Sequence, residues 1–188
     1  MKRILSVIAL LFPLSIAAQE PVVIEETFSD GSDLEWSETA DKKNSALLKE
    51  GYFELLPAKK GGSASTETSL PIDLTYDYDI ESTVFLPNLD NRVFGMTFGS
   101  YALFVSEGSA AIAKPGSGEE PVNTKIKLTG GKNRTVVLGL KQSAAKSVFT
   151  VNNMTVGEML PDSELTEAKL GFFTTAPMHI QSVKIEQK

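Results

Sequence analysis

The chain has 188 residues, 41% of them hydrophobic and 22% charged, a composition that fits a globular protein and excludes a disordered or fibrous one. The length is that of a single all-β domain with a sizeable core. The net charge of −6 excludes nucleic acid and anionic membranes as favoured partners, because both are recognised by basic surfaces.

The N-terminal residues have the three parts of a secretory signal peptide. Lys2 and Arg3 precede an apolar run at 4–12, and the small residues Ala17 and Ala18 end the segment. The run is shorter than the ~20 residues of a transmembrane helix, so the sequence predicts a cleaved signal and not an anchor. A buried N-terminal strand or helix is the alternative.

Cleavage after Ala18 separates a signal peptide at 1–18 from a domain at 19–188. The domain has a net charge of −8, because the signal carries two basic and no acidic side chains. Without cysteine, the chain has neither a disulfide nor a site for lipid attachment. We therefore expect an exported protein, periplasmic or secreted, that does not insert into the membrane. A neutral glycan, a cation or an envelope protein remains open as its partner.

Most of the domain consists of short apolar or alternating runs separated by clusters of Gly, Asp, Ser and Asn, which is typical of antiparallel strands. Gly51 separates two runs at the spacing of a tight hairpin, and the small hydroxyl residues of 63–70 suit an edge strand. A single helical turn is predicted at 162–168. Further strands are predicted at 22–28, 46–49, 52–56, 101–105, 110–114, 124–128, 134–140, 148–151, 170–174 and 179–185.

The clearest alternation runs from Tyr76 to Ser106. Apolar residues occupy one parity of its first strand and acidic residues the other, and a turn at 87–91 precedes a second strand at 92–98. We predict that the two strands form a hairpin with one buried apolar face. The predicted cross-strand pairs are Leu86 with Arg92, Val84 with Phe94, Ile80 with Phe98, Phe85 with Val93, Thr83 with Gly95 and Glu81 with Thr97.

About a dozen short strands with almost no helix favour a sandwich or a barrel. Four regions have motifs of a known superfamily: FSDGSDLEW with EGYFELLP (28–57), YDYDIESTVF with RVFGMTFG (76–99), NRTVVLGL with SVFTVNNMTVG (133–157), and LGFFTTAPMHIQSVKIE (170–186). The chain resembles the concanavalin A-like lectin/glucanase superfamily, and within it the laminin G-like domains of exported bacterial proteins. The resemblance implies a two-sheet antiparallel jelly-roll sandwich with one concave sheet. Relatives bind or cleave glycans on that sheet, and some hold calcium at its rim.

Family 16 glycoside hydrolases of this superfamily carry the strand motif Glu-x-Asp-x-(x)-Glu, to which Asp77, Asp79 and Glu81 are the nearest approach. The first position, the glutamate nucleophile of that motif, is an aspartate here, so the resemblance does not carry the activity over. Residues i and i+2 of a strand are also about 6.5 Å apart, whereas the carboxyl groups of a retaining pair are about 5 Å apart. The sequence therefore predicts no catalytic residue.

The polar parity of the same strand is a candidate carbohydrate-binding surface. Carboxylates can accept hydrogen bonds from sugar hydroxyls, and an exposed aromatic ring can stack on the CH face of a sugar. Small residues on the second strand would form the bottom of a groove. The candidate binding residues are Asp77, Asp79, Glu81, Phe85, Gly95 and Thr97. An ordinary solvated sheet face is the alternative interpretation.

Tryptophan, two aspartates of the first turn and the single histidine are interpreted as structural residues and not as ligand-binding ones. Trp36 is expected in the core and not as a stacking platform. Asp30 and Asp33 offer two carboxylates to calcium, which needs six or more ligands, so a capped turn is preferred and no cofactor is predicted. His179 is the only histidine, which leaves no His-based zinc site or serine triad, and we expect an exposed strand residue.

Three functions are compatible with the sequence. The first is an exported non-catalytic module for glycan binding or adhesion, which the lack of a convincing catalytic pair favours over an enzyme. The second is a small glycoside hydrolase or polysaccharide lyase on the same fold. The third is a structural envelope protein with no small ligand, and nothing in the sequence separates it from the first.

We predict that exported protein begins at or next to Gln19, because cleavage after Ala18 follows the small residues that a signal peptidase requires. Intact-mass spectrometry of the exported protein measures this directly. A mass that still includes Lys2 and Arg3 would show that the segment is an anchor.

Overall fold

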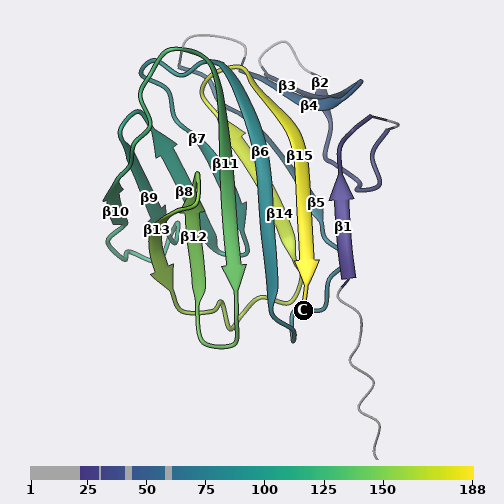
Figure 1. The fold of residues 1–188 in the computed structure, drawn as a ribbon, viewed down its shortest axis with the longest axis vertical. Coiled ribbons are helices and arrows are strands. Elements are labelled where there is room, and N and C mark those ends of the chain that lie inside the picture. Colours follow the sequence, from purple (N-terminus) through teal and green to yellow (C-terminus); the bar gives the residue numbers. More distant parts are fainter. Residues whose placement is uncertain (1–21, 30, 41–43, 58–60) are drawn as a thin grey trace, which may run out of the picture.

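The structure is a computed structural model that describes residues 22–29, 31–40, 44–57 and 61–188. The regular secondary structure of these residues is entirely β-strand, arranged as two facing sheets (Figure 1). The described residues contain no helix that is long and apolar enough to cross a membrane. The predicted signal peptide lies outside them.

All strand pairings are antiparallel, and the larger of the two sheets has nine strands. In spatial order, the large sheet consists of β13 (Met154–Met159), β12 (Ser147–Val151), β11 (Lys132–Gln142), β6 (Tyr78–Asn88), β15 (Met178–Gln187), β4 (Tyr52–Pro57), β3 (Asn44–Lys49) and β2 (Thr39–Ala40). Its ninth strand, β1 (Val22–Glu26), pairs with β15.

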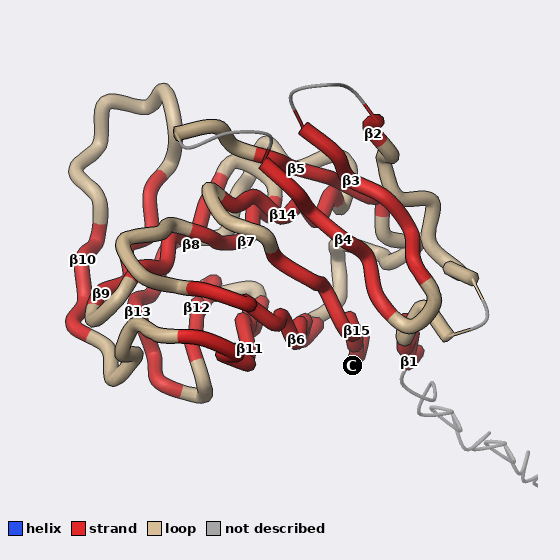
Figure 2. The backbone as a smooth tube through the Cα atoms, turned by 90° about the horizontal axis from the view of Figure 1, so that it is seen from above, coloured by secondary structure: helices blue, strands red, loops and turns tan. Residues whose placement is uncertain are grey.

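The small sheet has six strands. In spatial order, they are β10 (Val122–Lys125), β9 (Ser109–Ala113), β8 (Tyr101–Ser106), β7 (Phe94–Phe98), β14 (Lys169–Thr174) and β5 (Ala64–Ser69). The large sheet curves round the small one, so that β3 and β4 lie beside β5 (Figure 2). The predicted two-sheet sandwich is confirmed, and 63–70 does supply an edge strand.

The inner faces of the sheets form one continuous apolar core, in which Trp36 is 9% exposed. Its ring centre lies 6.0, 5.7 and 5.8 Å from those of Phe28, Phe53 and Phe172. These rings come from the first turn and from both sheets, so the tryptophan joins the two layers. Its predicted place in the core is confirmed.

The predicted hairpin between 76–86 and 92–98 is wrong, because β6 and β7 belong to different sheets. Val84 pairs with Val136 of β11 and Ile180 of β15, and not with Phe94. The segment between β6 and β7 crosses from one sheet to the other, and buried Leu89 lies within it. The two apolar parities do face each other, but across the core. Alternation reveals which residues point inward and leaves the paired strand undetermined.

The shorter hairpins are confirmed, since β3 pairs with β4 and β8 pairs with β9. The helical turn predicted at 162–168 is wrong: this segment contains a hydrogen-bonded turn and no helix. Asp162 nevertheless caps it, because its carboxylate accepts the N–H of Glu164 at 3.3 Å.

Gly95 of β7 is predicted to be irreplaceable by alanine. An added Cβ would overlap the backbone oxygen of Leu103 and lie 2.7 Å from the ring of Phe173. Because a backbone atom cannot move away cheaply, Gly95→Ala should lower the free energy of unfolding by about 3 kcal/mol, measured by urea denaturation.

Gly108→Ala is the matched control. Gly108 has φ +74° and open space where its Cβ would lie, so only the backbone strain of about 1 kcal/mol should appear. Equal losses in the two variants would contradict the predicted overlap at Gly95.

Candidate functional site

β6 lies inside the large sheet, between β11 and β15 (Figure 1). Tyr78, Ile80 and Val84 point into the core, and alternate residues of the strand therefore project from the outer face. These outward residues are Asp79, Glu81, Thr83 and Phe85. Three of the predicted binding residues, Asp79, Glu81 and Phe85, thus share one surface.

A polar hollow of about 170 Å³ lies at the Asp79 end of this surface. Gly139 of β11 and Thr150 lie in its wall, and the hydroxyl of Thr150 occupies the space where a Cβ of Gly139 would be. The charged and amide side chains around it are Asp79, Glu81, Glu186, Lys141, Lys184 and Asn153. The hollow therefore offers many hydrogen-bond donors and acceptors and little apolar area.

The charges of the hollow balance one another. Glu81 is directly opposite Lys184, and Asp79 is opposite Lys141. Lys188 Nζ lies 2.8 Å from Asp79 Oδ2, and this hydrogen bond raises the pKa of the Lys188 ammonium. Three carboxylates thus face three ammonium groups, an arrangement that favours an uncharged polar ligand over an ion.

Aromatic side chains occupy the other end of the same face. The His179 ring of β15 stacks on Tyr52 of β4 with ring centres 4.4 Å apart, and its centre lies 5.6 Å from that of Phe85. Glu54 completes the group, since its Oε1 is 3.7 Å from His179 Nε2. We call Phe85, His179 and Tyr52 the aromatic row. All three side chains are half-buried.

A β-bulge in β15 lets the hollow and the row share this face. The register of β15 against β6 shifts between Ile180 and Ser182. His179 and Lys184 are five residues apart, an odd number, so regular alternation would place them on opposite faces. The extra residue of the bulge restores the parity, and both side chains point outward.

The remaining predicted residues lie elsewhere. Asp77 precedes β6, and its Oδ1 accepts the N–H of Ala144 at 3.2 Å, at one end of the sandwich. Gly95 and Thr97 lie on the outer face of the small sheet. The groove predicted between Phe85 and these two residues is therefore not formed.

The small residues of β7 do not floor an open groove either. Phe173 of β14 is directly opposite Gly95, and its ring fills the space above the glycine. Thr97 occupies the corresponding space above Gly171. The predicted role of Gly95 and Thr97 thus becomes one of cross-strand packing.

Sequence reasoning missed Tyr52, Glu54 and the position of His179, which was expected to be exposed and is half-buried. The alternation of 52–56 contained a signal, because Tyr52 and Glu54 fall on the opposite parity from Phe53 and Leu55. The proximity of this strand to Phe85 depends on pairing between distant segments, which no local pattern reports.

Among the residues that the structure describes, no group of three or more His, Asp or Glu side chains is arranged to hold a metal ion. Asp30, one of the two residues considered for calcium, lies outside them. The backbone N–H of Asp33 donates to Glu26 Oε2 at 2.9 Å, and Glu26 also accepts from Phe28 and Ser32. This turn is held by a buried carboxylate, which the sequence did not indicate.

No protein-family model and no curated protein matches the sequence. Solved structures do match. The carbohydrate recognition domain of Emp47p has a TM-score of 0.64 and 9% identity over 90% of this chain and 98% of that one. The VIP36 exoplasmic/lumenal domain bound to Ca²⁺ and Man3GlcNAc has a TM-score of 0.60 and 12% sequence identity, over 81% of this chain and 84% of that one. Apo Crh5 transglycosylase has a TM-score of 0.61 and 13% sequence identity, over 87% of this chain and 83% of that one.

TM-scores of 0.60 to 0.64 show a shared fold, although the sequence identities are only 9–13%. The protein is a two-sheet antiparallel jelly-roll sandwich of the concanavalin A-like type, as the sequence resemblance implied. Both lectin domains and a transglycosylase have this fold, so the fold by itself does not choose between binding and catalysis.

His179 provides a direct test of the aromatic row. Burial lowers its pKa below the ordinary 6.5, against the opposing effect of Glu54. Because the folded protein binds this proton less readily than the unfolded chain does, stability should fall as the pH drops below 6.5. As the only histidine, it gives unambiguous signals in a proton NMR titration.

Glu54→Gln should lower the pKa of His179 further, since the carboxylate favours the imidazolium form. A His179 pKa at or above 6.5, or one that rises in Glu54→Gln, would contradict the described surroundings.

Proposed function

We propose that the protein is an exported, non-catalytic β-sandwich module that binds a neutral glycan on the outer face of β6. The observation that carries this proposal is the placement of the polar hollow and the aromatic row on one sheet face. Glu81 in the polar hollow and Phe85 in the aromatic row are about 13 Å apart along β6. A sugar presents hydroxyl groups and apolar CH faces together, and this surface offers partners for both.

The charge distribution supports a neutral ligand. Glu81 lies opposite Lys184 and Asp79 lies opposite Lys141, while Glu186 lies opposite Asp79, so the hollow presents charges of both signs to a charged polymer. Glycan binding is also consistent with the solved neighbours, because one is a carbohydrate recognition domain and another is bound to Man3GlcNAc.

The geometry favours binding over catalysis. Asp77, the first residue of the hydrolase-like motif, is not on this face, and Asp79 forms an ion pair with Lys188. Export and a role in adhesion rest on the predicted signal peptide and form part of the proposal.

Glycan-array binding of the mature protein and of Phe85→Ala tests the surface. Removing the ring takes away about 50 Å² of apolar contact, worth about 1.3 kcal/mol or a tenfold loss of affinity. Phe104→Ala is the matched control, because Phe104 is a half-buried aromatic residue on the outer face of the small sheet. Asp79→Asn should also weaken binding while changing stability by less than about 1 kcal/mol.

The same samples decide among the three functions. Retention of a neutral glycan that depends on Phe85 and not on Phe104 supports the proposal. New reducing ends that disappear in Glu81→Gln would establish a hydrolase instead. If no glycan is retained at millimolar concentration, the protein is a structural component of the envelope.

A further inference from the structure

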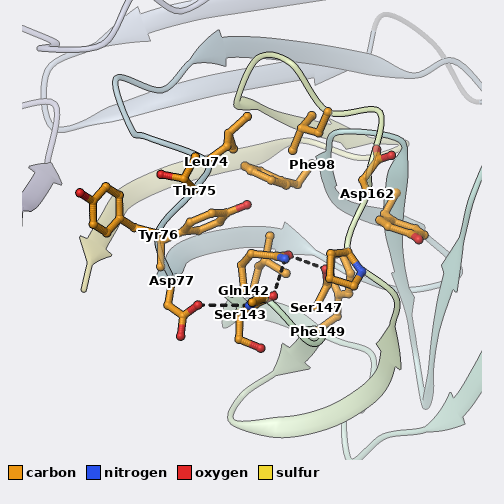
Figure 3. A pocket seen from close by; sticks show the side chains of 16 residues that line it. Leu74, Thr75, Tyr76, Asp77, Phe98, Gln142, Ser143, Ser147, Phe149 and Asp162 are labelled. Atoms are coloured by element: carbon orange, nitrogen blue, oxygen red, sulfur yellow. Dashed lines mark hydrogen bonds between the residues drawn. The ribbon is translucent and has the colours of Figure 1, made fainter.

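A second cavity lies at one end of the sandwich, where the sheets separate, and we call it the end pocket (Figure 3). It encloses about 140 Å³. The large sheet contributes Phe149, the small sheet contributes Phe98, and the loops contribute Leu74 and Asp162. It is separate from the polar hollow, with which it shares no residue.

Tyr78 contributes a phenol to the lining of this cavity, although the residue as a whole is only 1% exposed. Burial and the nearby Asp162 raise the pKa of this phenol, which therefore keeps its proton. A protonated phenol in the wall of a cavity can donate a hydrogen bond to water or to a ligand.

Aromatic rings and carboxylates dominate the lining. The rings belong to Tyr76, Tyr78, Phe98, Tyr101 and Phe149. Asp77 and Asp162 supply two carboxylates, and the described lining includes no Lys, Arg or His. Lys114 Nζ lies 5.9 Å from the centre of the Tyr101 ring, and the ammonium group of Lys188 interacts electrostatically with Asp77.

Asp162 is ionised at neutral pH. Burial acts to raise its pKa, but hydrogen bonds from Ser100 and Glu164 and the charge of Lys114 hold the pKa below its ordinary value. Its Oδ2 accepts the N–H of Ser100 at 2.9 Å, which fixes the carboxylate at the pocket.

The other polar groups of the lining are already engaged with one another. Ser147 donates its hydroxyl proton to Gln142 Oε1, and Gln142 Nε2 donates to the carbonyl of Ser143 at 2.9 Å. Few partners are left for a polyol, which would need several. A ligand with an apolar surface and one positive charge fits this lining better than a sugar does.

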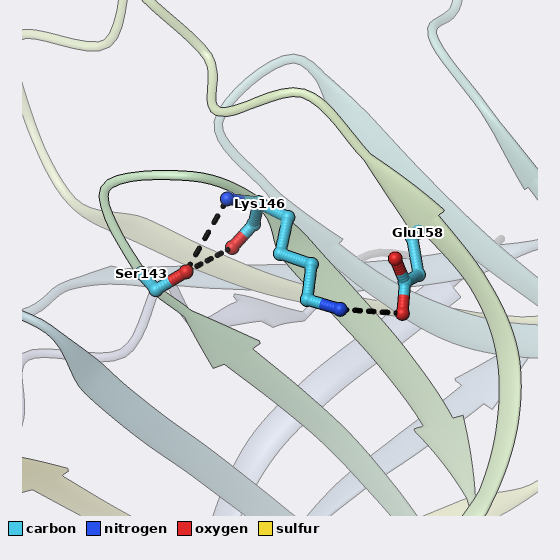
Figure 4. Close-up of polar contacts among 3 residues, drawn as sticks. All are labelled: Ser143, Lys146 and Glu158. Carbon is cyan, nitrogen blue, oxygen red and sulfur yellow. Dashed lines mark hydrogen bonds and ion pairs between the residues drawn. The ribbon is translucent and has the colours of Figure 1, made fainter.

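The wall beside Asp77 is a closed turn. Ser143 and Lys146 are linked through two hydrogen bonds of the Ser143 hydroxyl, and Lys146 Nζ lies 2.7 Å from Glu158 Oε1 (Figure 4). The ion pair turns this lysine toward β13, whose Glu158 it meets, so its charge is already neutralised. The backbone of the same turn holds Asp77 through the N–H of Ala144.

Two exposed apolar side chains lie in or next to the lining. Tyr76, which is 44% exposed, lines the pocket, and Leu160, which is 77% exposed, immediately precedes the lining residue Pro161. The hydroxyl of Tyr101 donates to the carbonyl of Leu160 at 2.9 Å and ties this loop to the pocket.

We propose that the end pocket binds a small organic cation, an alkylammonium or trimethylammonium group whose methyl surface contacts the rings and whose charge faces Asp77 and Asp162. Aromatic rings attract such cations through their negative faces, and enclosed groups of rings are the usual site for quaternary ammonium ligands. The volume is below that of a site for drug-sized ligands, so a group of a few heavy atoms is the right size. The proposal does not depend on glycan binding at β6.

Isothermal titration calorimetry of the mature protein with choline tests this proposal, and 3,3-dimethyl-1-butanol is the control. The two probes have the same shape, but the control has carbon in place of the charged nitrogen. Choline should bind in the millimolar range and at least about tenfold more tightly than the alcohol. Equal affinities would show a merely apolar cavity, and no heat of binding with either probe would overturn the proposal.

Two variants locate the site. Asp162→Asn should weaken choline binding about tenfold, and Tyr78→Phe should weaken it less because the ring remains. Asp79→Asn in the polar hollow should leave choline affinity unchanged. Thermal unfolding of each variant identifies any loss that comes from misfolding, and Tyr78→Phe keeps the test decisive if Asp162→Asn does not fold. Unchanged affinity in both pocket variants would place choline elsewhere and refute the site.

Discussion

The structure depends on the burial of two apolar sheet faces against each other. The chain has no cysteine, so no disulfide assists this contact. Val84 and Leu86 of one sheet, and Phe94 and Met96 of the other, are completely buried in it. Because alternate residues of a strand point to opposite sides, the packing that buries these side chains also determines which ones project outward. The two candidate binding surfaces are therefore consequences of the core.

Local periodicity was enough to predict most of the strands and their inward residues, although it missed β2 and β13. It favoured a sandwich or a barrel, and the superfamily resemblance then implied the sandwich. Periodicity could not predict the neighbours of β6, because the strands that pair with it begin at Lys132 and Met178, far along the chain. The turn residues at 87–91 suit a hairpin and also suit a crossing between sheets. In the structure the chain crosses between the sheets, and the two apolar parities contribute to the core from opposite sides.

In the candidate site too, local alternation predicted which residues share a face but not which distant strands lie beside them. Asp79, Glu81 and Phe85 stay together because they share one strand, so intrastrand parity sufficed. Gly95 and Thr97 were assigned through an assumed pairing and lie on the other sheet. Tyr52 and His179 reach Phe85 through pairings of distant segments, and the end pocket combines residues from both sheets and three connecting segments. None of these contacts leaves a local trace in the sequence.

The bulge in β15 makes this strand unusually sensitive to a change in length. Removing one residue near Gln181 would restore strict alternation, so one half of the strand would have to turn over. Either His179 would enter the core in place of Ile180, or Lys184 would replace a buried residue such as Val183. Gln181 itself is exposed to solvent, so its substitution should leave the core unchanged. At this point of the chain, the number of residues carries more structural information than their identity.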